Sequence, residues 1–201
     1  MYKGNVFAMN GYTLRSATPD DITAVLDIER LSFPDPWTEG MLLSSICEGI
    51  DFTLLLDGES LIGYSVLDRR VKGEAELHNI AVTPCYRGKG LSSLLMDKMI
   101  SDCSLYGVSV IFLEVRENNA PAIGLYNKYG FTEIGKRKNY YKNPTENAII
   151  MQRRVPGNRP EGNGDAGQPP GRKWRRALSS NTPSVANPSF FAETQRIISV
   201  G

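Results

Sequence analysis

A short turn in the middle of the chain combines two glycines with two basic side chains. It reads Tyr86-Arg87-Gly88-Lys89-Gly90-Leu91-Ser92 and follows an apolar segment that ends at Val82. Glycines allow a ligand to approach the backbone closely, and the N-terminus of a following helix favours negative charge. The turn therefore predicts an anion-binding site, with an ordinary surface loop as the alternative. Its spacing is that of neither a P-loop nor the dinucleotide-binding fingerprint.

A single carboxylate interrupts a later apolar run. Glu114 stands within Ile111-Phe112-Leu113-Glu114-Val115, where a carboxylate either forms a structural ion pair or works as a general base. Tyr126 follows on the next expected helix, and its phenol is either a core aromatic group or a proton donor. Glu76 and His78 share one face of the preceding strand and are rivals for the base. For His78, a partly buried structural histidine is the simpler interpretation.

Alternating strand and helix patterns position these residues and predict an α/β fold. The expected order is β-α-α-β-β-β-α-β-α-β-β. Strands are expected at 11–17, 51–57, 60–70, 74–82, 108–115, 131–141 and 146–154. Helices are expected after the cap Thr18-Pro19, from Trp37 to about Glu48, after Gly90, and after a cap at Asn118 or Asn119.

Composition divides the chain into a body and an extension. Residues 155–171 hold four Pro and five Gly, a composition that cannot bury enough apolar surface to offset the entropy of ordering. We therefore expect a folded domain over 1–154 and a basic, largely disordered extension over 155–201. Residues 1–152 carry a net charge of −4 and residues 153–201 a net charge of +5. Any contact with nucleic acid is accordingly expected from the extension alone.

Several protein classes conflict with the composition. No uninterrupted apolar stretch approaches the roughly 18 residues of a membrane span, and the N-terminus lacks the apolar core of a signal peptide. The cysteines Cys47, Cys85 and Cys103 include no close pair, and His78 is the single histidine. Neither a disulfide framework nor a structural zinc site is expected. The composition predicts a cytoplasmic protein without a metal, and we expect a monomer.

Five separated motifs resemble one known family. The segments NIAVTP, YRGKGLS, LEVRENNAPAIGLYNKYGF and the pair RKNYY and AIIM are similar to the GNAT superfamily of acetyl-CoA-dependent N-acetyltransferases. Within it, the stretch from Phe33 to Glu39 resembles the FPWSE stretch of the ribosomal-protein-alanine N-acetyltransferases. The resemblance covers about residues 10–152. It implies the GNAT fold, which is a mixed, mostly antiparallel, splayed sheet with helices on both faces.

The resemblance also implies a reaction and roles for individual residues. Acetyl-CoA would be the cosubstrate and the N-terminal alanine of a small-subunit ribosomal protein the acceptor, without a covalent enzyme intermediate. Glu114 matches the general base of the family and Tyr126 its general acid. The cofactor-binding positions would be Ile80, Ala81, Val82, Arg87, Gly88, Lys89, Gly90, Leu91, Ser92 and Asn119. The acceptor contacts would be Trp37, Glu39, Tyr140 and Tyr141.

Some details of this match stay open. Ile80 and Val82 would lie at a bulged strand end, with the Val82 N–H polarising the thioester carbonyl. Ser92 departs from the Gly or Ala that is usual at its position, so weaker cofactor binding is one expectation. Cross-strand packing is the alternative role for the tyrosine pair. Met9 lies where chains of the family usually begin, so residues 1–8 are expected to be dispensable.

The acceptor is open as well. An acidic body suits a cationic amine and a basic ribosomal protein, but another peptide N-terminus or a small amine fits the same chemistry. A CoA-binding or scaffold protein that acts through its basic tail is the alternative of another class. The joint presence of Glu114 and Tyr126 argues against it, because a scaffold needs neither. RNA binding through residues 172–176 is compatible with either reading.

Overall fold

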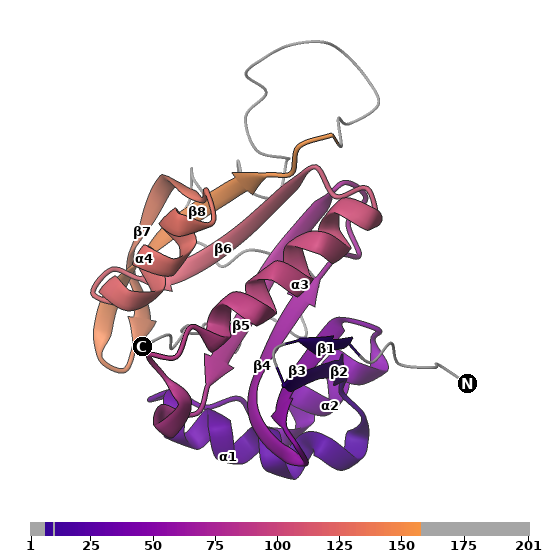
Figure 1. Cartoon of the computed structure of the whole chain (residues 1–201). Helices are drawn as coiled ribbons and strands as arrows, with labels where there is room; N and C mark the ends of the chain where they lie inside the picture. Colours follow the sequence, from indigo (N-terminus) through magenta and orange to yellow (C-terminus); the bar gives the residue numbers. More distant parts are fainter. Residues whose placement is uncertain (1–6, 10, 158–201) are drawn as a thin grey trace.

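The computed structural model describes residues 7–9 and 11–157, which form one mixed sheet covered by helices (Figure 1). The sheet has eight strands in the order β1-β2-β3-β4-β5-β6-β8-β7. The strands are β1 (Phe7–Met9), β2 (Tyr12–Ser16), β3 (Asp51–Asp57), β4 (Ser60–Asp68), β5 (Glu74–Val82), β6 (Val110–Arg116), β7 (Thr132–Lys142) and β8 (Thr145–Arg154). The helices are α1 (Ile22–Ser32), α2 (Glu39–Cys47), α3 (Leu91–Leu105) and α4 (Ala120–Lys128). The expected α/β architecture, with helices on both faces, is confirmed.

Side-chain caps begin two of the helices where the sequence predicts them. The Thr38 side chain accepts a hydrogen bond from the Met41 N–H at the start of α2, and Asn119 Oδ1 accepts from the Ala122 N–H at the start of α4. The first helix begins differently from the prediction. Residues Pro19–Asp21 form a single 3₁₀ turn, and α1 follows only from Ile22.

The seven predicted strands are all present, with bounds within two residues of those expected, and β1 is an additional strand. β3 and β5 have the predicted bounds, whereas β4 ends at Asp68 rather than at residue 70. There the Asp68 carboxylate accepts from the Arg70 N–H and turns the chain out of the ladder. β1 was not predicted, because three residues are too few for a period. Phe7 and Ala8, expected to be dispensable, pair with β2.

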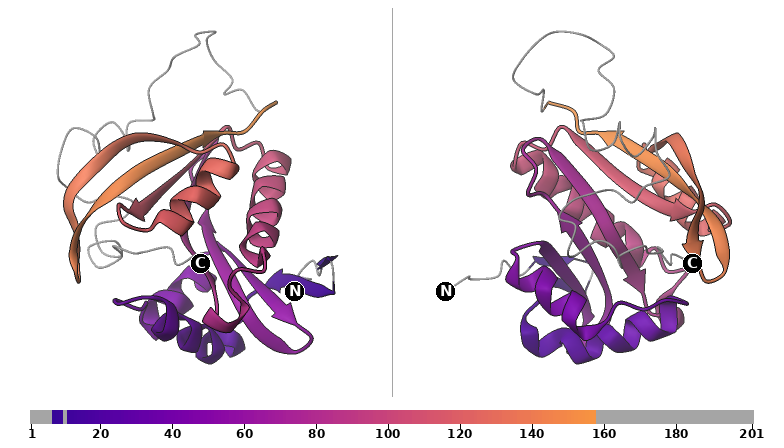
Figure 2. Two further views of the ribbon diagram at one scale, coloured as in Figure 1. Left: turned by 60° about the vertical axis from the view of Figure 1, so that its left-hand side comes forward. Right: turned by 180° about the vertical axis from the view of Figure 1, so that it is seen from behind.

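The two faces of the sheet carry separate cores. One core lies under α3 and α4 and includes Leu95, Met99 and Leu113. The other lies under α1 and α2 and includes Val25 and Leu42. Figure 2 shows the two helix pairs on opposite sides of the sheet. No helix among residues 11–157 is both long and apolar enough to cross a membrane.

A bulge in β5 reverses the alternation of its side chains. Val66 of β4 pairs with Asn79, and Leu67 pairs with Leu77, so His78 is the extra residue. As a result Leu77 and Ile80, three positions apart, both enter the core under α3 and α4. The resemblance implied a bulge at Ile80–Val82; the structure corrects this to His78, opposite the break in the β4 register.

The one parallel pair of the sheet separates halfway along. β5 and β6 pair from Glu74 with Val110 to Leu77 with Leu113, and no further. Beyond these residues the two strands diverge (Figure 1), while β6 stays paired with β8 as far as Arg116. The divergence leaves the last part of β5 without a neighbour on one edge. This is the splayed sheet that the sequence comparison implied.

Candidate functional site

Glu114 lies one residue beyond the last pair between β5 and β6. Its neighbours Leu113 and Val115 point into the core under α3 and α4, so alternation directs Glu114 to the opposite face, the face of α1 and α2. Arg137 Nη1 of β7 lies 2.8 Å from Glu114 Oε1. The Tyr140 hydroxyl also hydrogen-bonds to Glu114. The carboxylate is therefore held from the β7–β8 hairpin at the edge of the divergence.

Tyr126 of α4 packs on the opposite face of the sheet from Glu114, the face covered by α3 and α4. Its side chain is fully buried in the core under α3 and α4, and its ring packs edge-on against Phe131 with centroids 5.6 Å apart. The hydroxyl has no hydrogen-bond partner among the described residues, and burial raises its pKa well above the ordinary value. An unpaired buried hydroxyl costs about 1–3 kcal/mol. A ligand acceptor such as a carbonyl oxygen or a sulfur would remove that cost.

The glycine-rich turn has the conformation that an anion site requires. Gly88 and Gly90 adopt φ values of +73° and +74°, and a Cβ on either would meet open space. Gly90 is also the N-cap of α3, so the N–H groups of Leu91 and Ser92 lack intrahelical acceptors, while the Ser93 N–H donates to the Gly90 carbonyl at 3.0 Å. Lys89 adds positive charge, with Nζ 4.6 Å from the centroid of the Tyr86 ring. The turn suits a phosphate group.

Arg87 braces this turn with its side chain. Its Nε donates to the Val82 carbonyl oxygen at 3.0 Å and its Nη2 to Ser32 Oγ at 3.1 Å. Burial lowers the pKa of Arg87 from its usual value. The guanidinium thus links the turn to the end of β5 and to the end of α1.

Beyond the divergence, the edge of β5 that faced β6 has no neighbouring strand within the described part of the chain. The Thr83 N–H donates to Ile62 O of β4 at 2.8 Å. Backbone groups alternate along a strand, so the Val82 N–H points to the opposite edge, where β6 has separated. Ile80 has the same orientation, and Ala81 pairs with Tyr64 of β4. The free edge can accept an extended ligand by strand-like pairing.

The α1–α2 loop lies against the β7–β8 hairpin. Asn143 Nδ2 donates to Asp35 Oδ1 at 3.4 Å across the two segments. Trp37 of this loop is 2% exposed, and its Nε1 has no hydrogen-bond partner within the described residues. Its ring centroid lies 6.4 Å from that of His78. Glu39, the other candidate acceptor contact here, is exposed at the start of α2.

The hairpin tyrosines have different surroundings. Tyr141 is buried, with the Arg116 guanidinium 4.3 Å from its ring centroid. Tyr140 packs edge-on against Tyr141, and burial together with the hydrogen bond to Glu114 raises its pKa well above the ordinary value. Tyr141 therefore has a packing role, whereas Tyr140 contacts the candidate base Glu114.

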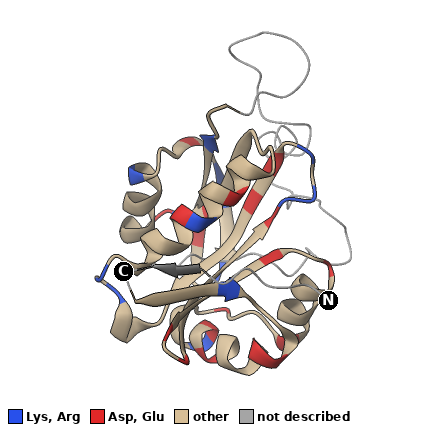
Figure 3. Ribbon diagram, turned by 45° about the vertical axis from the view of Figure 1, so that its right-hand side comes forward, with Lys and Arg blue, Asp and Glu red and all other residues tan. Residues whose placement is uncertain are grey.

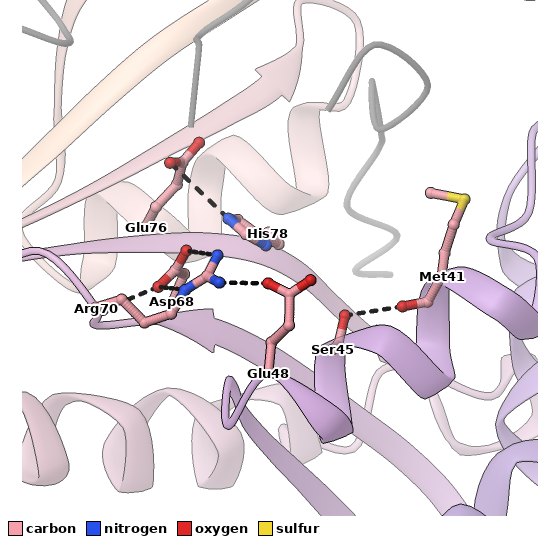
Figure 4. A network of polar contacts seen from close by, with 7 residues as sticks. All are labelled: Met41, Ser45, Glu48, Asp68, Arg70, Glu76 and His78. Carbon is pink, nitrogen blue, oxygen red and sulfur yellow. Dashed lines mark hydrogen bonds and ion pairs between the residues drawn. The ribbon is translucent and has the colours of Figure 1, made fainter. Parts of the chain in front are cut away.

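The rival base residues pair with each other. His78 Nε2 lies 3.8 Å from Glu76 Oε2, beside the cluster in which Arg70 bridges Asp68 and Glu48 (Figure 4). His78 occupies the bulge on the face of α1 and α2. In the structure His78 is thus a partly buried histidine whose neighbour is the Glu76 carboxylate.

Sequence reasoning missed a buried polar network behind the site. Glu29 of α1 is fully buried and accepts from the Tyr64 hydroxyl, from Asn79 Nδ2 at 2.7 Å and from the Trp37 N–H at 2.7 Å. The signal was a carboxylate at helical spacing from Ile22 and Val25, on the apolar face of the helix. Arg137 was missed too, because the β7 segment is rich in charges and shows no clear alternation.

Acidic residues predominate in the segment that contains α1 and α2. Between Thr18 and Glu48 the chain has seven Asp and Glu against one basic residue, Arg30. Figure 3 shows acidic positions recurring along the helices of this region. Their field favours a positively charged partner.

Comparisons with known proteins agree on one family. Residues 22–131 match the family described as the acetyltransferase (GNAT) family. The chain is 38% identical over 144 residues to the [ribosomal protein bS18]-alanine N-acetyltransferase of Escherichia coli strain K12, a match that covers 69% of this chain and 95% of the relative. The protein of that name from Haemophilus influenzae is 37% identical over 134 residues, covering 65% and 90%.

Solved structures agree with this match. The crystal structure of the ribosomal-protein-S18-alanine N-acetyltransferase from Escherichia coli is similar, with a TM-score of 0.68 and 34% identity over 72% of this chain and 94% of that chain. Ard1 from Thermoplasma volcanium is similar to the same degree, with a TM-score of 0.68 and 32% identity over 72% and 98%. Both likenesses cover the folded body of the chain.

Proposed function

Because the chain belongs to the acetyltransferase (GNAT) family, we propose that it transfers the acetyl group of acetyl-CoA to the N-terminal α-amine of a protein. The acceptor that we propose is the N-terminal alanine of a small-subunit ribosomal protein. Relatives at 37–38% identity, matched over 90–95% of their length, carry the name of that activity for bS18. The observation that carries the proposal is the strand divergence, with Glu114 on one face of the sheet and the unpaired Tyr126 hydroxyl on the other.

The chain offers a set of groups that would hold acetyl-CoA. The turn from Arg87 to Ser92, with Gly88, Lys89, Gly90 and Leu91, would bind its pyrophosphate, and Arg87 would keep that turn in place. The free edge of β5 from Ile80 to Val82, together with Asn119, would bind the pantetheine arm. Acetyl-CoA supplies an acetyl thioester there, and the Val82 N–H would donate to the thioester carbonyl.

Glu114 and Tyr126 would move protons at the two ends of the reaction. An N-terminal ammonium has a pKa near 8, so about a tenth of the amine is neutral at pH 7. Glu114 would take the proton of the amine, directly or through a water, while Arg137 and Tyr140 hold the carboxylate. The Tyr126 hydroxyl would donate to the departing sulfur. Attack is direct, so no cysteine nucleophile is needed, and Cys85 is an exposed residue beside the turn.

The acceptor would enter between the α1–α2 loop and the β7–β8 hairpin. Trp37 and Glu39 belong to the first wall, and Tyr140 to the second; Tyr141 would support Tyr140 from beneath. The acidic surroundings suit a basic ribosomal protein. We further propose that the enzyme acts as a monomer in the cytoplasm, where ribosomal proteins are made. The extension over 155–201, of which residues 158–201 lie outside the described residues, remains a candidate ribosome contact.

A panel of three acceptors tests the proposal. Thiol release from acetyl-CoA is measured with an Ala-starting ribosomal peptide, with the same peptide blocked at its N-terminus but carrying lysine, and with a polyamine. We expect turnover on the free N-terminus alone. Turnover on lysine or polyamine alone would contradict the proposed acceptor while leaving the acetyltransferase reaction intact.

A further inference from the structure

Arg137 is a buried cation with unused donors. Its side chain is 2% exposed, and Nη1 lies 2.8 Å from Glu114 Oε1. Its guanidinium carbon lies 5.0 Å from the centroid of the Tyr140 ring. Neither Nε nor Nη2 has a hydrogen-bond partner among the described residues. The ion pair with Glu114 therefore uses Nη1 alone and leaves Nε and Nη2 without a partner in the described part of the chain.

A second buried arginine on the same face shows how such a group is normally satisfied. Arg116 Nη1 donates to the Pro144 carbonyl at 3.0 Å and to Glu146 at 2.9 Å, and its Nη2 donates to the Asn143 carbonyl at 2.7 Å. Both terminal nitrogens of that guanidinium are paired within the protein, whereas its Nε has no partner among the described residues. Leaving buried donors unpaired costs about 1–3 kcal/mol each, and more for charged groups. The contrast points to a missing acceptor atom beside Arg137.

We propose that Arg137 binds the carbonyl oxygen of the first residue of the acceptor. This inference rests on the proposed function. The amine nitrogen and the carbonyl oxygen of an N-terminal residue are roughly 3 Å apart, joined through Cα. The Glu114–Arg137 pair places a negative and a positive group side by side, with 2.8 Å between Oε1 and Nη1, and the amine and carbonyl of an N-terminal residue carry the complementary charges. Glu114 would face the amine while the free Arg137 donors face the carbonyl.

The arrangement gives a physical basis for selecting N-termini over other amines. A lysine side chain or a polyamine has no carbonyl oxygen beside its amine carbon. The amine of such an acceptor would bind Glu114, but nothing in the acceptor would accept a hydrogen bond from the buried Arg137 guanidinium. Sites built to hydrogen-bond a group reject analogues that lack it, because their own polar atoms lose a partner. Arg137 would therefore be a specificity-determining residue rather than only a support for Glu114.

The test compares two acceptors that differ in one carbonyl. One is an Ala-starting peptide, and the other has its first peptide bond replaced by a trans-alkene, which keeps the shape and removes the oxygen. The ratio of kcat/KM for the two is measured within each variant, so a general loss of activity cancels. We expect the wild type to prefer the amide by about tenfold to a hundredfold, as for a charged hydrogen bond. Arg137→Met should reduce this ratio to near one, and Arg137→Lys should retain part of it.

A neighbouring lysine provides the matched control. Lys136 lies next to Arg137 on β7, is exposed and pairs with Glu117 at 2.5 Å. Lys136→Met removes the same charge from the same strand and should leave the ratio at the wild-type value. Thermal unfolding and acetyl-CoA binding report whether each variant is folded.

The outcomes separate this inference from the proposed function. An unchanged ratio in Arg137→Met, with both rates reduced, would overturn the inference and make Arg137 a positioning residue for Glu114. A wild-type ratio of one would overturn it directly, even if Arg137→Met did not fold. Absence of any turnover on free N-termini would instead count against the proposed function.

Discussion

At the scale of single residues, Glu114 and Tyr126 differ in whether their polar atoms have partners. Glu114 is partnered by Arg137 and by Tyr140, so its orientation is set before any acceptor arrives. Tyr126 has a fixed ring, and its hydroxyl lacks a partner among the described residues. A held carboxylate and a buried hydroxyl without a partner among the described residues are the two features that the proposed proton transfers require.

Replacing the base should affect turnover more than cofactor binding. We expect Glu114→Gln to lower kcat by about 10²–10⁴-fold, the usual range for general base catalysis. The affinity for acetyl-CoA should stay nearly unchanged, because the turn from Arg87 to Ser92 lies elsewhere. Isothermal titration and steady-state kinetics measure the two quantities. Glu76→Gln is the matched control and should retain activity; a larger loss there than at Glu114 would exchange the two roles.

Removing the Tyr126 hydroxyl should separate activity from stability. We expect Tyr126→Phe to lower kcat by about 10²-fold. Its free energy of unfolding should be unchanged or higher, since the hydroxyl that is lost has no partner among the described residues. Tyr64→Phe is the control, because that buried hydroxyl is bonded to Glu29 and its loss should cost about 1 kcal/mol or more. A fully active Tyr126→Phe would remove the proposed acid role.

At the scale of elements, three local features of the middle of the chain build the site. The bulge at His78 turns Ile80 and Val82 toward α3. The separation of β5 from β6 after Leu77 frees the edge of β5. The turn then reverses the chain into α3 through Gly90, a left-handed N-cap. As a result, the free edge of β5 leads directly to the N-terminus of α3.

The conformation of Gly90 gives a test of the turn. We expect Gly90→Ala to destabilise the fold by about 1–2 kcal/mol, because an L residue is strained at φ +74°. It should also weaken acetyl-CoA binding, since the strain is relieved by moving the anion-binding backbone. Chemical denaturation and titration measure both effects.

A second glycine separates the effect of conformation from that of an added methyl group. Gly124, in the interior of α4, has open space around it and a helical backbone. Gly124→Ala should be neutral or stabilise the protein by about 0.5–1 kcal/mol. Equal acetyl-CoA affinity in wild type and Gly90→Ala would argue that the turn does not hold the cofactor.

At the scale of the whole molecule, the sheet separates two cores and the site spans both. Glu114 faces the α1–α2 side, and Tyr126 belongs to the α3–α4 side. The Glu29 network ties α1 to β4, β5 and the α1–α2 loop through Tyr64, Asn79 and the Trp37 backbone. The α1–α2 loop and strands β4 and β5 are thus joined to α1 by one buried carboxylate.

Thiol reactivity should report the integrity of the core under α3 and α4. Cys47 and Cys85 are exposed, whereas Cys103 is buried, and burial raises the pKa of the Cys103 thiol to about 12. At pH 8 the buried Cys103 therefore stays protonated and shielded. A colorimetric thiol reagent should therefore label two cysteines in the native protein and three in denaturant. Rapid labelling of all three in the native protein would contradict the packing of α3.

Much of the fold follows from local patterns in the chain. Alternating apolar residues bounded by Asp57-Gly58 and Lys72-Gly73 predicted β3 and β5 at their observed bounds. A cap at Asn118 or Asn119 predicted the start of α4, since capping involves residues three apart, and Asn119 is the observed cap. The roles proposed for Glu114 and Tyr126 came from motif resemblance rather than from a local pattern of the chain.

The tertiary structure decided what depends on partners distant in sequence. The bulge at His78 follows from the pairing of β5 with β4, and β1 exists only because β2 offers it an edge. Arg137 meets Glu114 across a separation of 23 positions, and Glu29 meets Asn79 across 50. No local period encodes such contacts, because which charges pair and which donors stay unpaired is settled only when the strands are registered and buried. The sequence alone therefore determined the elements and the candidate chemistry, and the folded chain determined how those groups are held.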